Sequence, residues 1–379
     1  MKVEKLSNSI NMKAQLKKLG VDKGGIDILA QKANMHIVHI HNLHVGAANI
    51  LKQDALSIGA DLSVPRGTVI AAKPEVDAIL IANTKQLKVL AKKELAQPFG
   101  LKDLAKKLKE FSEIKKQKNA DIMGIINAND DSFYAGSRFK NSDAVRSIEV
   151  MISEGATIID IGAVSSRPNA PMVSVEEELA RIEPILQIIQ EEKLYEKVKF
   201  SCDSYEPRVI QKALESGFCI VNDITGLEND EVCKLCASYD ATAIIMHMQG
   251  RPQTMQQNPR YENILDDVYS FLEHRMQKAQ SFGIKDIVLD VGIGFGKTLE
   301  NNLMLIKNLE HFLTLNKALL VGASRKSMID KISSSTVEQR LPGTLALHLE
   351  ALRNGASILR VHDVPEHVQA LKVFKALSL

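Results

Sequence analysis

The stretch 286–297, DIVLDVGIGFGK, combines an apolar run, a carboxylate and a glycine-spaced turn. The apolar residues predict a short buried strand that presents Asp290 at its carboxyl end, and the turn that follows holds Phe295 and Lys297. The glycines resemble a phosphate-binding loop, but the motif GxxxxGK[ST] aligned on Lys297 requires glycine where Val291 stands. The spacing therefore excludes a Walker-type nucleotide site.

Asp290 follows one of several similar apolar runs, and segments of helical periodicity separate these runs. The eight runs cover 122–126, 157–161, 198–202, 218–221, 243–246, 287–289, 318–321 and 358–361. Eight strands alternating with helices in roughly 250 residues predict a (β/α)8 barrel, here spanning 120–379. An open, doubly wound sheet is the alternative, and the regular spacing favours closure.

Polar side chains follow every predicted strand. They are Asn127, Gly162 with Ser165, Ser166 and Arg167, Asp203, Asn222 with Asp223, His247, Asp290, Ser324 with Arg325 and Lys326, and Arg360 with His362. In a barrel these positions converge at the carboxyl-end face, where the loops build active sites. A single strand-end Asp is often a helix cap, but eight polar ends in register predict one functional cleft.

This cleft divides into two chemical halves. Carboxylate, amide and ammonium groups in the first half suit a flat heterocycle rich in N–H donors and ring acceptors: Asp203, Asn222, Asp290 and Lys326. Cationic and hydrogen-bonding groups in the second half suit a phosphate or diphosphate: Asn127, Arg167, Arg360 and His362. For Arg167 and Arg360 the alternative is a structural ion pair with a carboxylate.

The overall composition is that of a globular protein, with 45% hydrophobic residues and a formal net charge of +2. This balance gives no indication of nucleic-acid or anionic-membrane binding. The N-terminus has no apolar signal core, and no apolar run approaches about 18 residues, so we expect a soluble, cytoplasmic protein. Cys233 and Cys236 form a C-x-x-C without a second pair, so all four cysteines are interpreted as reduced thiols.

Residues 1–112 predict a smaller N-terminal α/β module without a recognisable chemical motif, and 113–119 a linker. Strands are expected at 35–41, 68–72 and 77–82, and helices at 45–58, after an N-cap at Asn83, and at 101–111. Four histidines cluster at positions 36, 39, 41 and 44. Because no carboxylate or cysteine was expected beside them, we interpret them as strand and turn residues rather than metal ligands.

The strand-end motifs, in this order, resemble those of dihydropteroate synthases in the pterin-binding barrel family. The matching segments are IMGIINANDDSF (122–133), GATIIDIGAVSSRP (155–168), FSCDSY (200–205), IVNDITG (220–226), MHMQGRPQTMQ (246–256), LDVGIGFGKT (289–298), VGASRKS (321–327), RLPGTLA (340–346) and ILRVHDV (358–364). The resemblance covers 120–379 and leaves the N-terminal module unexplained.

The resemblance implies a transferase that condenses para-aminobenzoate with 6-hydroxymethyl-7,8-dihydropterin pyrophosphate in folate biosynthesis, giving 7,8-dihydropteroate and pyrophosphate. It also implies a Mg²⁺ cofactor, a homodimer and a target of sulfonamides. The matching positions place the pterin on Asp203, Asn222, Met246, Asp290 and Lys326, the diphosphate on Asn127, Arg360 and His362, and para-aminobenzoate beside Ser166, Arg167, Pro168, Phe295 and Ser324. Asn127 would also contact Mg²⁺, and the implied catalytic groups are Asp203, Asp290, Lys326 and Arg360.

The sequence departs from the family pattern in three places. The usual N-V-T-P-D-S-F becomes NANDDSF at 127–133, the usual proline after Asp290 is Val291, and the usual G-G-E-S-T-R-P becomes GAVSSRP at 162–168. A pterin-dependent methyltransferase and a non-catalytic pterin-binding paralogue are the alternative functions. Arg360, His362 and the S-R-K-S turn argue against the methyltransferase, which needs no diphosphate site.

Overall fold

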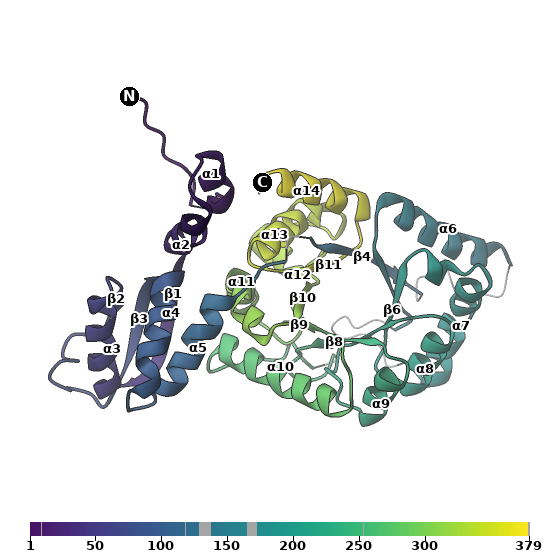
Figure 1. Cartoon of the computed structure of the whole chain (residues 1–379). Coiled ribbons are helices and arrows are strands. Elements are labelled where there is room, and N and C mark those ends of the chain that lie inside the picture. Colours follow the sequence, from purple (N-terminus) through teal and green to yellow (C-terminus); the bar gives the residue numbers. More distant parts are fainter. Residues whose placement is uncertain (9, 118, 129–137, 165–172, 253, 378–379) are drawn as a thin grey trace. The chain divides into compact units, whose positions relative to one another are not determined.

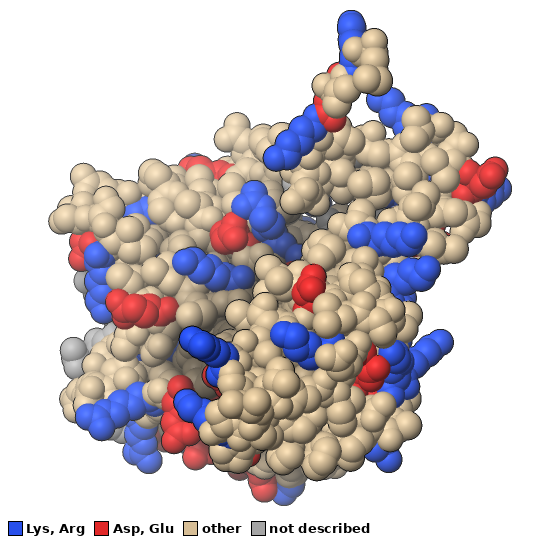
Figure 2. All heavy atoms as spheres, turned by 90° about the vertical axis from the view of Figure 1, so that its left-hand side faces the viewer, with Lys and Arg blue, Asp and Glu red and all other residues tan. Residues whose placement is uncertain are grey.

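The computed structural model describes every residue except 9, 118, 129–137, 165–172, 253 and 378–379, and in 138–144 it describes the backbone alone. One compact unit contains Met1–Lys115 and the other Lys116–Phe374. Within the described residues, no helix has both the length and the apolar character needed to cross a bilayer. On the face shown in Figure 2, Lys and Arg are scattered among Asp and Glu, without one field of a single sign.

The larger unit is a closed barrel of eight parallel strands in the order β10-β11-β4-β5-β6-β7-β8-β9, with helices around it (Figure 1). The strands are β4 (Asp121–Asn127), β5 (Ile158–Gly162), β6 (Lys199–Asp203), β7 (Ile220–Asp223), β8 (Thr242–Met246), β9 (Ile287–Asp290), β10 (Ala318–Val321) and β11 (Ile358–Val361). This confirms the predicted (β/α)8 barrel and its eight strands.

Helices alternate with these strands as the sequence predicts. They are α6 (Arg138–Glu154), α7 (Val175–Glu191), α8 (Pro207–Glu215), α9 (Asp230–Ser238), α10 (Ile264–Ser281), α11 (Leu299–Lys307), α12 (Ser327–Ile332), α13 (Leu341–Arg353) and α14 (Val364–Leu377), with 3₁₀ turns at Leu194–Glu196, Leu309–Leu315 and Glu338–Arg340. Cys233 and Cys236 are buried, reduced thiols in α9.

A layer of apolar side chains fills the barrel interior. It consists of Met123, Ile158, Ile220, Ile244, Val288, Leu320 and Ile358. Because side chains alternate between the two faces of a strand, residues two positions further along each strand also point inward. Five of those seven positions hold Asp160, Asn222, Met246, Asp290 and Arg360, and the other two hold Ile125 and Gly322. The apolar layer therefore closes the barrel from below, and a polar layer lies directly above it toward the carboxyl ends.

The smaller unit is a three-stranded antiparallel sheet, in the order β1-β3-β2, with helices. Its elements are α1 (Met12–Lys18), α2 (Lys23–Ala33), β1 (Met35–His44), α3 (Val45–Ser57), β2 (Asp61–Ser63), β3 (Glu75–Asn83), α4 (Thr84–Lys93), a 3₁₀ turn (Glu94–Ala96) and α5 (Leu101–Glu113). Alternating residues of β3 are buried, and this inner face packs in a core with α3, α4 and α5. The expected α/β module is confirmed.

One strand of this module was predicted wrongly. Residues 68–72 form a turn in which Thr68 N donates to Pro65 O and Ala71 N donates to Thr68 O, and Ala71 has a φ of +53°. The third strand is instead β2, from Asp61 to Ser63. The proline and Gly67, at φ +93°, favour the turn over an extended conformation.

Candidate active site

Arg360 lies at the centre of the polar layer, where it bridges two carboxylates. Its Nε donates to Asp160 Oδ2 at 2.6 Å and its Nη2 donates to Asp203 Oδ2 at 2.6 Å. The pairs join β11 to β5 and β6 across the barrel interior. Arg360 therefore forms the ion pairs that the sequence analysis named as the alternative to a phosphate contact, and its Nη1 is not used by either pair.

Asn222, at the end of β7, is held by Asp160, one of the two carboxylates that Arg360 contacts. Its Nδ2 donates to Asp160 Oδ2 at 3.1 Å, which leaves the amide oxygen as an acceptor for a ligand N–H. Two buried oxygens, Asp160 Oδ1 in this layer and Ser201 Oγ at the neighbouring position of β6, have no hydrogen-bond partner in the described part of the chain. Such atoms are costly to leave unpaired, so the layer fits a bound polar ligand or ordered water.

Burial shifts the acidity of the two strand-end aspartates. Burial raises the pKa of Asp203 to about 7, and the positive charge of Arg360 opposes that shift. Burial also raises the pKa of Asp290, opposed by the hydrogen bond that Gly292 N donates to Asp290 Oδ1 at 2.8 Å. Ring N–H groups of a ligand would stabilise both carboxylates in their ionised form, because hydrogen bonds to a charged group favour it.

An apolar wall lies beside these groups. Met246 at the end of β8 packs with Ile224, Met255 and Phe295 in one buried cluster. The Lys326 ammonium lies 4.1 Å from the centre of the Phe295 ring, a cation–π distance. The structure thus combines carboxylates, an amide, a thioether and a cation above an aromatic face, which suits a flat heterocycle.

The turn after β9 is held in shape by Lys297. This side chain is 2% exposed, and its Nζ donates to Gly292 O and Phe295 O, both at 2.9 Å, and lies 2.9 Å from His247 Nδ1. Burial lowers the pKa of Lys297 to about 7 and that of His247 to about 2, so the imidazole is neutral. Gly292 has a φ of +68°, and a Cβ there would lie 1.9 Å from His247 O, so glycine is required.

The loops after β10 and β11 are joined to each other. Ser324 Oγ lies 2.9 Å from His362 Nδ1 and accepts a hydrogen bond from His362 N at 3.2 Å. Arg325, at φ +55°, donates from Nε to Asp363 Oδ2 at 3.1 Å. The left-handed backbone at Arg325 turns the chain between Ser324 and Lys326, so that two predicted site residues lie on one braced turn.

A chain of buried hydrogen bonds supports the same two loops from below. Ala323 N donates to His348 Nε2 at 3.0 Å, His348 Nδ1 lies 2.9 Å from His367 Nε2, and His367 Nδ1 lies 2.5 Å from Asp363 O. A backbone N–H can only donate, so His348 Nε2 accepts from Ala323 N and the proton of the neutral His348 ring is on Nδ1. His367 Nε2 then accepts from His348 Nδ1, and the proton of the His367 ring is on Nδ1, where it is donated to Asp363 O. Burial lowers the pKa of both imidazoles, in agreement with neutral rings.

Comparison with known proteins agrees with this geometry. The family model described as pterin binding enzyme matches residues 123–362, more than half of the chain. The chain belongs to the pterin-binding enzyme family. Within that family it is a dihydropteroate synthase, a transferase of folate biosynthesis that forms dihydropteroate from para-aminobenzoate and a dihydropterin pyrophosphate. The family and the reaction predicted from the strand-end motifs are confirmed.

Three similar proteins illustrate the extent of the match. A bifunctional dihydropteroate synthase/dihydropteroate reductase of Helicobacter pylori is 43% identical over 376 residues, 99% of both chains. The structure of Yersinia pestis dihydropteroate synthase with a sulfonamide drug is 36% identical, covers 68% of this chain and 94% of its own, and has a TM-score of 0.64. The Thermus thermophilus enzyme in complex with 4-aminobenzoate is 37% identical, covers 68% and 95%, and has a TM-score of 0.62.

The structure brings together the described residues that this dihydropteroate synthase was expected to use. Asp203 is joined to Arg360, Lys326 to Phe295 and Ser324 to His362, while the half-buried Asn127 ends β4, whose neighbour β11 carries Arg360. Three other predicted residues, Ser166, Arg167 and Pro168, lie outside the described residues, as do most of the loops 127–143 and 163–177.

Sequence reasoning missed two residues of the candidate site. Asp160 lies inside an apolar strand rather than at its end, and Lys297 was noted without a role. The available signal for Asp160 was its inward register, two positions beyond Ile158 and two before Gly162. For Lys297 the sequence offers no comparable signal, because its partner His247 is far away in the chain.

Proposed function

We propose that the polar layer above the barrel core is the pterin pyrophosphate site of this synthase. Asp203, Asn222 and Asp290 accept or donate the hydrogen bonds of the ring, and Met246 packs against its face. Lys326, held over Phe295, supplies a donor at the ring edge. The observation that carries this proposal is the bridge of Arg360 to Asp160 and Asp203, because it fixes the carboxylate of Asp203, which is proposed to bind the ring, next to a cation.

The diphosphate is proposed to lie beside Arg360, His362 and Asn127. Arg360 Nη1 remains to donate to phosphate oxygens, and the Ser324–His362 pair presents further polar atoms. In the described part of the chain, the barrel mouth has no group of three acidic, His or Cys ligands. Proteins commonly hold Mg²⁺ through one or two oxygen ligands together with substrate phosphates. Asn127 would provide the amide oxygen, and the ion would offset diphosphate charge.

The reaction breaks the bond between the pterin methylene carbon and the diphosphate oxygen and forms a bond from that carbon to the arylamine nitrogen. Asp203 and Asp290 stabilise positive charge that develops on the pterin, and Arg360 stabilises the departing anion. The arylamine is neutral at pH 7 and loses its proton after attack. Positioning alone contributes several kcal/mol to such a step. We therefore expect no covalent enzyme intermediate.

Para-aminobenzoate is proposed to bind beside Phe295 and Ser324. The family resemblance assigns Ser166, Arg167 and Pro168, which lie outside the described residues, to the same site. Closure of the loops 127–143 and 163–177 would exclude water from the reacting carbon. Replacing Arg167 with alanine should raise the Michaelis constant for para-aminobenzoate and leave that for the pterin substrate unchanged. An unchanged constant for para-aminobenzoate would remove Arg167 from this site.

The test of the whole proposal is a coupled assay for pyrophosphate release. Release should require both para-aminobenzoate and Mg²⁺, which separates a synthase site from a methyltransferase or a pterin-binding paralogue. Calorimetry should show that Asp203→Asn weakens binding of the pterin pyrophosphate, whereas the exposed variant Asp286→Asn binds as the wild type does. Wild-type affinity in Asp203→Asn would contradict the assignment of the ring site.

A second activity is suggested by the Helicobacter pylori relative, whose name includes dihydropteroate reductase. That relative matches 99% of this chain, whereas the two solved structures each match 68%. We propose that this chain also reduces its own product. The step adds two electrons and two protons to a ring C=N bond, so an added hydride donor is required. Mass spectrometry should detect product two hydrogens heavier with NADH or NADPH, and its absence with both would oppose the proposal.

Homodimer formation, which the family resemblance implies, and a cytoplasmic location are also proposals. Sedimentation of the purified chain at several concentrations measures the first directly. Fractionation of the source cells measures the second.

A further inference from the structure

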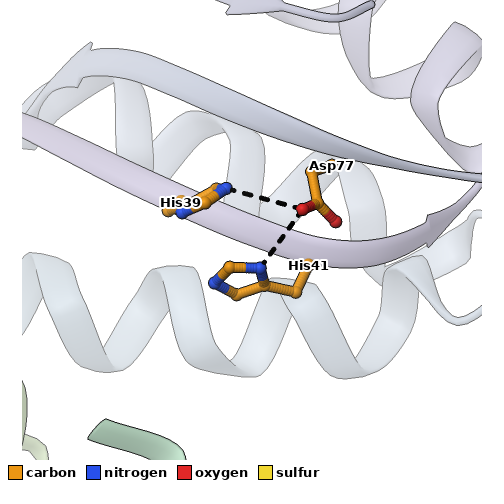
Figure 3. Close-up of side chains that lie close together, drawn as sticks. All are labelled: His39, His41 and Asp77. Atoms are coloured by element: carbon orange, nitrogen blue, oxygen red, sulfur yellow. Dashed lines mark ion pairs between the residues drawn. The ribbon is translucent and has the colours of Figure 1, made fainter. Parts of the chain in front are cut away.

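The four clustered histidines of the N-terminal module separate into two pairs. His36 Nε2 lies 2.7 Å from Thr84 Oγ1, and His44 Nδ1 accepts a hydrogen bond from Gly46 N at 3.1 Å, so both have structural partners. The other two, His39 and His41, lie on the exposed face of β1, and their ring centroids are 3.9 Å apart. These two rings are directed toward a third potential ligand, Asp77 on β3 (Figure 3).

An irregularity in the strand pairing creates this arrangement. Ile40 pairs with Ala78 and Leu43 pairs with Val76, so that two residues of β1 lie opposite Asp77 alone. Asn42, the second of the two, has a φ of +49°. Such a bulge redirects side chains and often occurs beside functional sites. Here it brings the His41 ring and the Asp77 carboxylate to the same face.

This finding corrects the sequence-based interpretation, which expected no carboxylate near the histidines. Asp77 lies far from them in the sequence, but antiparallel pairing places it opposite His41. Its Oδ1 accepts a hydrogen bond from Asn42 N at 3.0 Å. That bond lowers the pKa of Asp77 and fixes the orientation of the carboxylate. The remaining oxygen, Oδ2, is the atom directed at both imidazoles.

The distances suit a small divalent cation. Asp77 Oδ2 lies 3.5 Å from His41 Nδ1 and 4.0 Å from His39 Nε2, and all three ligand atoms lie within 4.8 Å of one another. Ligands about 2.0–2.1 Å from a tetrahedral zinc ion are separated by about 3.3–3.4 Å. Small rotations of these exposed side chains, which move the ligand atoms by about one ångström or less, close the difference.

The donor set also discriminates between metals. Two imidazole nitrogens and one carboxylate oxygen match late first-row divalent ions, whereas Mg²⁺ and Ca²⁺ prefer six or more oxygens. A carboxylate oriented by a backbone N–H is the outer-sphere support that tunes such sites. Ion pairs at an exposed surface contribute little to stability. A stabilising role therefore does not explain why His39, His41 and Asp77 lie together.

We propose that His39, His41 and Asp77 form a binding site for a late first-row divalent metal, with Zn²⁺ as the representative ion. Three protein ligands leave the fourth tetrahedral position for water or an exogenous group, the arrangement of an open site rather than a closed structural one. The proposal concerns the N-terminal module and does not depend on the assignment of the synthase site.

The test is a Zn²⁺ titration of the metal-free full chain at pH 7.5 against a chromophoric chelator. We expect one equivalent to bind, and His39→Ala and Asp77→Asn each to weaken it roughly tenfold or more. Matched controls are Asp61→Asn, on β2 of the same sheet, and His274→Ala, an exposed histidine of α10. Both controls should bind Zn²⁺ with wild-type affinity, and excess Mg²⁺ should not compete.

A spectroscopic measurement separates ligation from a general loss of folding. Co²⁺ in a tetrahedral nitrogen and oxygen site gives strong visible absorption, which should appear in the wild type and both controls and be lost in His39→Ala. Pyrophosphate release should be unchanged in all five proteins. Equal Zn²⁺ affinity in the wild type and Asp77→Asn, or a Co²⁺ spectrum unaffected by His39→Ala, would overturn the proposal.

Discussion

The Arg360 guanidinium contacts Asp160 through a 2.6 Å bond between Nε and Oδ2, although the two residues lie on strands β11 and β5, on either side of β4. The pair positions groups around the proposed pterin site, because the same carboxylate oxygen also accepts from Asn222. Asp160 itself is fully buried and is not placed against the substrate. It is therefore a positioning residue rather than a catalytic one.

Replacement of Asp160 with asparagine should weaken pterin pyrophosphate binding roughly 10- to 100-fold, because a charged partner of Arg360 is lost and Asn222 is no longer oriented. The Michaelis constant for para-aminobenzoate should change little. Calorimetry with the pterin substrate and steady-state kinetics measure the two effects separately. Asp286→Asn, exposed before β9, is the control. Equal losses for both substrates would show that Asp160 only maintains the fold.

Replacement of Lys297 with methionine should destabilise the turn after β9. The buried carbonyl of Phe295 would lose the donor that Lys297 provides, at a cost of about 1–3 kcal/mol, and Gly292 O would keep only the hydrogen bond from Phe295 N. Because Gly292 N also binds Asp290, pterin affinity should fall with the free energy of unfolding. Urea denaturation and calorimetry test both effects. The exposed Lys307→Met is the matched control, and an unaltered midpoint in Lys297→Met would refute the structural role of this lysine.

The paired imidazoles of His348 and His367 predict acid sensitivity. Burial lowers the pKa of both rings, so the unfolded chain binds more protons than the folded one below about pH 6.5. Stability should therefore decrease as the pH falls from 7.5 to 5.5. In His348→Phe this pH dependence should be smaller, although the variant is less stable at pH 7.5. Thermal denaturation at both pH values measures the slopes, and identical slopes would exclude a contribution from His348.

Glu94 in the N-terminal module predicts the opposite dependence on pH. It is completely buried, and both of its carboxylate oxygens have no hydrogen-bond partner among the described residues. Burial, and to a smaller extent the negative charge of Asp54, raises the pKa of Glu94 to about 7. The folded state thus retains a proton that the unfolded chain releases above about pH 4.5, so this contribution to stability is lost as the pH rises toward 7.

The variant Glu94→Gln removes this titration. It should raise the stability of the module at pH 8 by on the order of 1 kcal/mol, with little effect at pH 5. Hydrogen exchange of amides in α3 and α4 reports on this module within the full chain. Glu113→Gln, exposed in α5, is the control. A stabilisation of equal size at both pH values would show that the effect does not arise from the proton.

Much of the barrel site could be predicted from the sequence because strand and site share one pattern. An apolar run that ends in Asp290 specifies both the strand and the position of the carboxylate at the mouth. The same logic placed Asn222 and Arg360. Asp160 was missed because an acid within an apolar strand differs from its neighbours only by the direction of its side chain, which depends on closure of the barrel.

The N-terminal module contains one feature that the local sequence predicts and one that it does not. The capping box of Asn83 and Gln86 is local, and the helix after it was predicted. The approach of Asp77 to His41 depends on a bulge whose position is set by pairing between two strands. Lys297 and His247 are likewise joined only when β8 and β9 are neighbours. Such relationships require the tertiary fold and have no counterpart in local sequence.

The pairing of β11 with β4 has a consequence for how the protein is made. Leu359 of β11 lies beside Ile122 of β4. The edge of β4, the first strand of the barrel, is therefore covered only after β11, the last strand, has been synthesised. As the chain leaves the ribosome, the nascent barrel is an open sheet with an unpaired border until its final strand emerges. The small N-terminal sheet needs no such delay, since all of its strands are synthesised early.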